Sequence, residues 1–166
     1  MLVITAAGGY ADGDVTSPTE DRCMTTCPEC GAAHNDGLTC EARFHLLLAW
    51  EAQDAALQQV HFLTVASYNL QHPAMFQPAA LAGLRSAFRA YLRDGVPISA
   101  VRAAMRPSVD GATKVLRPIA ERQPVLRTWP MTIADVTLPD QPAGAAERVQ
   151  AWAQAILHVL ESNTNC

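Results

Sequence analysis

The residues of this chain that are best suited to chemistry are three cysteines near its N-terminus. Cys27 and Cys30 form a Cys-x-x-Cys turn that is closed by Gly31. Such a turn presents two thiolates on one tight loop, as in many zinc sites. Cys40 adds a third thiol at the start of a predicted helix, where the helix dipole stabilises a thiolate. The sequence therefore predicts a zinc site built on Cys27, Cys30 and Cys40.

The fourth ligand of this predicted site has four candidates. His34 would give a local zinc knuckle and Cys23 is also local, whereas His61 and His72 fall on a later predicted helix. These two histidines lie eleven positions apart, roughly 16 Å along a continuous helix, so one ion cannot bind both. An antiparallel hairpin of the first two helices would return the end of the second helix to Cys40. This geometry favours His72, with His34 as the main alternative.

A second group of residues could support acid–base catalysis. Glu51 interrupts the apolar stripe of the first helix, and His61 leads the stripe that faces it. A buried carboxylate beside an imidazole is suited to general acid–base chemistry. We hypothesise that the pair lies level across the hairpin and lines a small cleft separate from the zinc. An early start of the second helix at Asp54 would instead offset the two side chains by about two turns.

Asp135 is a third acid that such a pocket could use. It stands in the pattern Thr132-x-x-Asp135, which is a variant of the capping box at the start of a helix. That pattern favours a structural role for Asp135 over a catalytic one.

Apolar periodicity predicts the helices that must position these residues. We expect helices at about 40–53, 55–71, 78–93, 99–105 and 143–161. Asp54 can cap the second helix and Pro73 helps to end it. Six prolines interrupt residues 107–142, so this segment is predicted to be irregular, with a short capped turn or a strand at 132–136.

The succession of helices with short connections predicts an all-α helical bundle with an N-terminal zinc-knuckle loop and a Pro-rich irregular segment. We expect residues 1–22 to form a loose tail and residues 23–166 a single zinc-binding helical domain. No apolar run approaches the roughly 20 residues of a membrane helix, so no membrane association is expected. The Cys-x-x-Cys motif and an odd number of cysteines, five, indicate a metal site in the reducing cytoplasm.

Basic residues are concentrated in the middle of the chain. Nine of the twelve fall between Arg85 and Arg127, although the formal net charge is −4. Arg85, Arg89 and Arg93 recur every four residues on one predicted helix face. This face could bind nucleic acid, although a solvated helix face is the more common explanation.

Three segments of the chain resemble a bacterial family that is known only as a domain of unknown function. They are Cys27 to Ala32, Val60 to Pro73 and Thr132 to Val136, and the Gln-His-Pro at 71–73 is the most specific feature. The resemblance runs from about residue 27 to 156. It implies that family members keep the Cys-x-x-Cys, a later cysteine and both histidines, while the loop between the cysteines varies in length. A ligand on a variable loop is disfavoured, and His34 lies on this loop. It implies no activity.

These observations favour a zinc-binding protein with structural zinc, acting as a binding or regulatory module for an unidentified protein or small-molecule partner. The alternative is a small, hydrolase-like metal-dependent enzyme that uses an open zinc position or a Glu51/His61 pocket. The number of protein ligands separates the two. Four ligands close a structural site, whereas three ligands and a water make a catalytic one.

Overall fold

The structure is a computed structural model that describes residues 26–111, 114–137 and 141–162. Within these ranges the chain forms seven α-helices and two 3-10 turns and no β-strand, which confirms the predicted all-α class. Thr26 and Ala33, and likewise Phe76 and Leu116, form isolated antiparallel bridges. The tail expected at 1–22 and the candidate ligand Cys23 lie outside the described residues.

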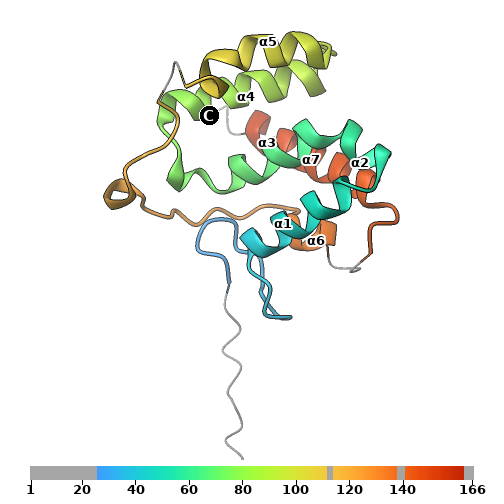
Figure 1. Ribbon diagram of the computed structural model, residues 1–166. Coiled ribbons are helices and arrows are strands. Elements are labelled where there is room, and N and C mark those ends of the chain that lie inside the picture. Colours follow the sequence, from blue (N-terminus) through green and yellow to red (C-terminus); the bar gives the residue numbers. More distant parts are fainter. Residues whose placement is uncertain (1–25, 112–113, 138–140, 163–166) are drawn as a thin grey trace, which may run out of the picture.

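The helices form two groups that are joined by a central pair. The elements are α1 (Cys40–Glu51), α2 (Ala55–Gln59), α3 (His61–Gln71), η1 (Pro73–Met75), α4 (Pro78–Leu92), α5 (Ile98–Val109), η2 (Ile119–Glu121), α6 (Ile133–Thr137) and α7 (Ala145–Ser162). Helices α4 and α5 lie side by side at one end of the molecule, and α1 and α6 pack together at the other (Figure 1). Between them, α3 packs against α7 and also contacts α4.

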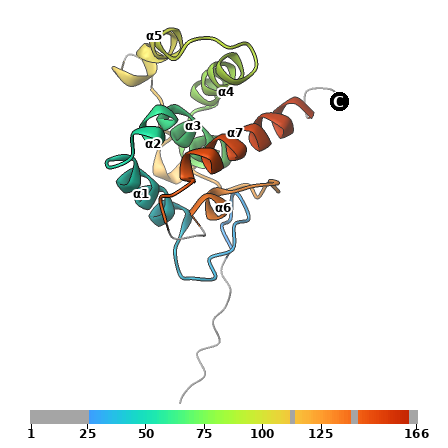
Figure 2. The ribbon, with the colours of Figure 1, turned by 90° about the vertical axis from the view of Figure 1, so that its right-hand side faces the viewer.

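The core is centred on the contact between α3 and α7, which Figure 2 shows from the side. Trp152 of α7 is fully buried, and its indole Nε1 donates a hydrogen bond to Gln71 Oε1 at 3.2 Å. The Gln71 amide in turn donates to the carbonyl oxygen of Met131 at 2.8 Å. Gln71 is only 1% exposed, so this buried amide has partners on both of its polar atoms. It fixes the end of α3, where the next residue is His72.

The single helix predicted at 55–71 is wrong, because the chain breaks at Val60 into α2 and α3. Asp54 caps α2 as expected, with its Oδ1 accepting from the amides of Ala56 and Leu57 at 2.8 and 3.2 Å. Leu57, Val60 and Leu63 are all buried. Val60 is the C-cap of α2 and the residue before α3, so the chain changes direction there with its side chain in the core.

Two other boundaries also differ from the sequence prediction. Helix α1 ends at Glu51 rather than at 53. Helix α5 begins after Pro97 and runs to Val109 with Pro107 inside it, beyond the predicted end at 105. A proline near the end of a helix removes only one backbone hydrogen bond, and the helix closes with the amide of Asp110 donating to the carbonyl of Arg106 at 3.0 Å. Among the described residues, no helix is both long and apolar enough to cross a membrane.

Candidate metal centre

The Cys-x-x-Cys segment folds into a tight turn. The amide of Cys27 donates to the carbonyl of Ala32 at 2.8 Å, and the amide of Gly31 donates to the carbonyl of Cys27 at 3.0 Å. Gly31 has φ +73°, a left-handed conformation that glycine adopts without steric cost. The turn therefore places the Cys27 and Cys30 side chains on one side of the loop, and both are buried.

The third cysteine, Cys40, is the first residue of α1. Thr39 is the N-cap residue, and its Oγ1 accepts from the amide of Ala42 at 3.1 Å. The positive end of the helix dipole lies at this point and favours a thiolate. The Sγ atoms of Cys30 and Cys40 are 3.6 Å apart, much longer than the roughly 2.05 Å of a disulfide, and both thiols are free.

His72 reaches this group from the end of α3. Its Nδ1 lies 2.8 Å from the carbonyl oxygen of Tyr68, which can only accept, so Nδ1 carries the proton and donates. When the ring is neutral, its lone pair therefore lies on Nε2, the usual arrangement of a histidine that binds a metal. This Nε2 is buried and has no hydrogen-bond partner among the described residues. A buried polar atom without a partner is costly, so a ligand for Nε2 is expected.

The four donor atoms lie close enough to share one ion. One atom each from Cys27, Cys30, Cys40 and His72 lies within 4.8 Å of all the others, and all four residues are buried. Zinc–sulfur bonds of about 2.3 Å in a tetrahedron separate two sulfurs by roughly 3.8 Å, close to the 3.6 Å between Cys30 and Cys40. Three soft thiolates and one imidazole suit zinc, and four ligands leave no open position for water.

The electrostatics of the group also fit a cation. Interaction with the Cys30 and Cys40 thiols holds the pKa of Cys27 far below its ordinary value, whereas the Cys27 and Cys30 thiols raise the pKa of Cys40. Burial lowers the pKa of His72, but the neighbouring Cys27 and Cys30 thiols outweigh it and raise that pKa to about 10. Buried negative charges this close together repel one another. A divalent ion would supply the charge that allows three thiolates side by side.

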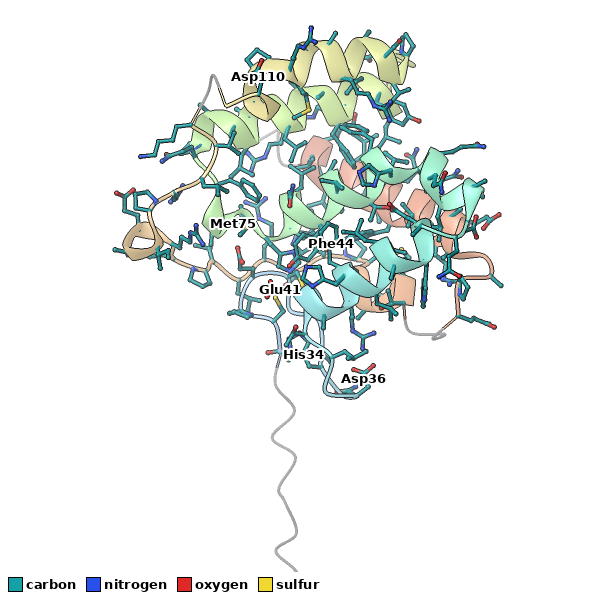
Figure 3. The ribbon with its side chains drawn as sticks, viewed as in Figure 1. His34, Asp36, Glu41, Phe44, Met75 and Asp110 are labelled. Carbon is teal, nitrogen blue, oxygen red and sulfur yellow. The ribbon has the colours of Figure 1, made fainter. Side chains whose placement is uncertain are left out.

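The described alternatives for the fourth ligand, His34 and His61, lie outside this group of four donors. His34 is outside the group of four, but its Nε2 lies 3.6 Å from Cys40 Sγ, the distance of a hydrogen bond to sulfur. It is therefore suited to support the Cys40 thiolate from outside the ligand set. The loop that carries the labelled His34 and Asp36 lies on the side of α1 that faces away from α4 and α5 (Figure 3). His61 is occupied elsewhere, as a partner of Glu51.

Two contacts that sequence reasoning missed hold the cysteine loop in place. Glu29 Oε1 accepts from the amide of Ala74 at 2.8 Å, just after His72, while the Glu29 carbonyl accepts from the amide of Arg127 at 2.8 Å. The only sequence signal for this role is the position of Glu29 between two cysteines. It ties one side of the loop to the segment that carries the histidine.

Arg43, the second missed residue, holds the other side of the loop. Its guanidinium is 2% exposed and donates to Asp36 Oδ2 at 2.6 Å and to Thr137 Oγ1 at 2.9 Å. This one side chain thus links the loop, α1 and α6. The available signal was that Arg43 is the only arginine of the first helix.

Aromatic rings complete the surroundings of His72. The Tyr68 ring stacks on His72 with centroids 4.3 Å apart and on Phe44 of α1 with centroids 4.2 Å apart. The imidazole is therefore fixed by a stack and by its bond to the Tyr68 carbonyl. Both restrict the direction of Nε2.

The structure brings the weaker catalytic candidates Glu51 and His61 together. Glu51 Oε2 lies 2.6 Å from His61 Nδ1, although Asp54 does start a separate helix. The offset that such an early start would give does not arise, because the break at Val60 redirects α3. The Glu51 side chain is 7% exposed and that of His61 is 51% exposed, so the imidazole lies at the surface.

Asp135 is used for helix capping. Its Oδ2 accepts from the amide of Thr132 at 2.7 Å and from the Thr132 hydroxyl at 3.0 Å, at the start of α6. In a capping box, the acid three residues after the N-cap residue accepts from the amide of that residue in the same way. They agree with the structural role that the sequence favoured.

The arginines predicted to form a face on α4 make contacts within the protein. Arg89 donates to the carbonyl of Leu160 in α7 at 2.7 Å. Arg93 pairs with Asp94 at 2.7 Å and approaches Glu161 at 3.9 Å. Burial lowers the pKa of Arg85. These contacts fasten α4 to α7, and binding of nucleic acid to this face stays a prediction.

Comparison with known proteins gives a family and no activity. The model of a family of unknown function, DUF5946, matches residues 25–161, a range that includes all four residues of the candidate metal centre. No curated protein and no solved structure matches the chain. The resemblance noted in the sequence is confirmed by this match. Because the match covers most of its length, the chain belongs to the family of unknown function DUF5946.

Proposed function

We propose that this protein is a zinc-binding helical module in which the metal has a structural role. The observation that carries the proposal is the buried Nε2 of His72, which has no hydrogen-bond partner among the described residues and lies with three buried thiols. Cys27, Cys30, Cys40 and His72 would hold the ion. A closed set of four ligands is typical of structural zinc.

The position of the site supports this role. Its donors come from the cysteine loop, from the start of α1 and from the end of α3. A single ion would therefore join three segments of the fold. The free, buried thiols also support a reducing compartment, and we place the protein in the cytoplasm. A module stabilised in this way would act through binding or regulation.

Metal analysis tests the proposal directly. We expect one zinc ion per chain in protein purified under reducing conditions, and a lower melting temperature after chelation, because the metal favours the folded state. Cys30→Ser should lose the ion, and His34→Ala is the matched control that should keep it. Metal-free protein with an unchanged melting temperature would falsify the proposal.

The contact between Glu51 and His61 favours a second candidate function, general acid–base catalysis by a small hydrolase-like enzyme. The buried carboxylate orients the half-exposed imidazole at 2.6 Å, which is the arrangement of a base and its orienting group. Hydrolysis of a panel of esters and amides would be measured for the native chain and for Glu51→Gln and His61→Ala. Turnover that both substitutions abolish supports this candidate, and turnover that neither changes contradicts it.

A further inference from the structure

A cavity of about 510 Å³ lies between α3, α4 and α5, away from the candidate metal centre. None of the four metal-site residues lines it. Its walls are mainly apolar side chains, among them Phe62, Val65, Leu81, Leu84, Val101 and Met105. Both its volume and its apolar lining are those of pockets that bind small organic molecules.

The cavity also has a small set of polar groups. Arg102 and Arg106 lie one turn apart on α5, line the cavity and are solvent-exposed, so they stand at its mouth. No carboxylate within the described ranges forms an ion pair with either guanidinium. Two unpaired guanidiniums at the mouth of an apolar pocket suit an anionic head group, because each presents a planar set of donors.

On α3, His61 also lines this cavity. The Glu51 carboxylate fixes its Nδ1, so that Nε2 is the nitrogen left for another partner. The lining groups of the cavity therefore include two cations and an oriented imidazole, and no acid. This charge distribution disfavours a cationic ligand.

From the cavity, its apolar walls and its cationic mouth, we propose that this protein binds an amphipathic small molecule with one anionic head group. The apolar body would lie between α3, α4 and α5, and the head group, a carboxylate or a phosphate, would lie against Arg102 and Arg106. This site is independent of the proposed zinc role, so either can fail alone.

Titration calorimetry of the full chain tests the ligand class. The probes are dodecanoate, dodecyl phosphate and dodecyltrimethylammonium, all below their micelle-forming concentrations. Binding of either anionic probe and no binding of the cationic one is expected, and the stronger anion identifies the head group. Equal binding of the anionic and cationic probes, or no binding of either anion, overturns the proposal.

Substitutions at the mouth test the head-group site. Arg102→Gln and Arg106→Gln should each weaken binding of the anionic probe about tenfold or more, as expected for a lost charged hydrogen bond. Lys114→Gln, which removes a nearby positive charge outside the lining, is the matched control and should have little effect. An equal loss in all three variants would mean general electrostatic attraction and contradict the site.

Filling the cavity tests where the apolar body lies. Ala80 lines the cavity, whereas its neighbour Ala79 is exposed and outside the lining. Ala80→Trp should abolish binding of the anionic probe and Ala79→Trp should not, with circular dichroism and melting temperature confirming that both fold. Binding that survives Ala80→Trp refutes the proposal, as does self-association on sedimentation that blocks the cavity of the native chain.

Discussion

Replacing His72 with alanine is the sharpest test of the metal centre, because His34 offers a matched control on the same cysteine. His72→Ala removes one of four donors, together with the hydrogen bond from Nδ1 to the Tyr68 carbonyl at 2.8 Å. His34→Ala removes only a contact of 3.6 Å to Cys40 Sγ from outside the set. The two variants therefore separate a ligand from a supporting residue.

The expected size of the effect follows from these contacts. Loss of a residue that merely supports a ligand costs about 10–100-fold in metal affinity, so loss of a ligand should exceed 100-fold, or about 2.7 kcal/mol. The lost hydrogen bond adds about 1 kcal/mol. At roughly 2–4 °C per kcal/mol for a chain of this size, the melting temperature of His72→Ala should fall by roughly 7–15 °C.

The assay is competition with a chromophoric chelator, followed by thermal unfolding of the same samples. His72→Ala should release its metal at a far lower chelator concentration than the native chain, and His72→Cys, which restores a soft donor, should recover most of the affinity. His34→Ala loses only a supporting contact, so its affinity should fall by no more than about 10–100-fold and it should keep its metal at chelator concentrations that strip His72→Ala. If His34→Ala releases the metal while His72→Ala keeps it, the site is a local knuckle and the argument from the hairpin is wrong.

Three further predictions follow from individual contacts. Metal affinity should rise with pH. The metal-free protein holds a proton on His72 with a pKa of about 10, and the ion must displace this proton to bind. A metal affinity that is the same at pH 6 and pH 9 in chelator competition contradicts this prediction. Gly31→Ala should lower the free energy of unfolding by about 1–2 kcal/mol, because φ is +73° and a side chain strains this left-handed backbone conformation. The added Cβ would not clash, since it would lie an ordinary 3.5 Å from Leu126 Cδ1. An unchanged midpoint in chemical denaturation contradicts this backbone strain. Glu51→Gln should cost no more than about 1 kcal/mol in the same assay, because its partner His61 is half exposed, and a much larger loss would mean that the pair is effectively buried.

The sequence predicted the elements of the metal centre better than their surroundings. The cysteine spacing and the hairpin argument were sufficient to select Cys27, Cys30, Cys40 and His72 as the group that the structure brings together. Each of these inferences needed only local geometry and an antiparallel return of the chain. The supporting contacts of Arg43 could not be predicted, because Asp36 and Thr137 lie far apart in sequence and meet only in the tertiary structure.

The errors in the predicted fold also arise where tertiary contacts, rather than local geometry, decide the structure. Helix periodicity identified α1, α4 and α7 to within a few residues. It failed at Val60, because the cap at Asp54 and the end at Pro73 were interpreted as the two ends of one continuous helix. The contact of Glu51 with His61 was expected only without an early start of the second helix at Asp54, yet it forms with that early start because the chain breaks again at Val60. The 510 Å³ cavity was not foreseen, because it depends on where α5 packs along α4.

The order of the four donors along the chain has a consequence for synthesis of the protein. Cys27, Cys30 and Cys40 leave the ribosome first, and His72 follows later. At about 5–20 residues per second, this interval lasts a few seconds. During it, an ion bound by the three thiolates alone could still exchange with cellular metal-binding thiols. Once α3 packs back and His72 binds, the proposed ion would be enclosed, so metal selection and completion of the hairpin would become the same event.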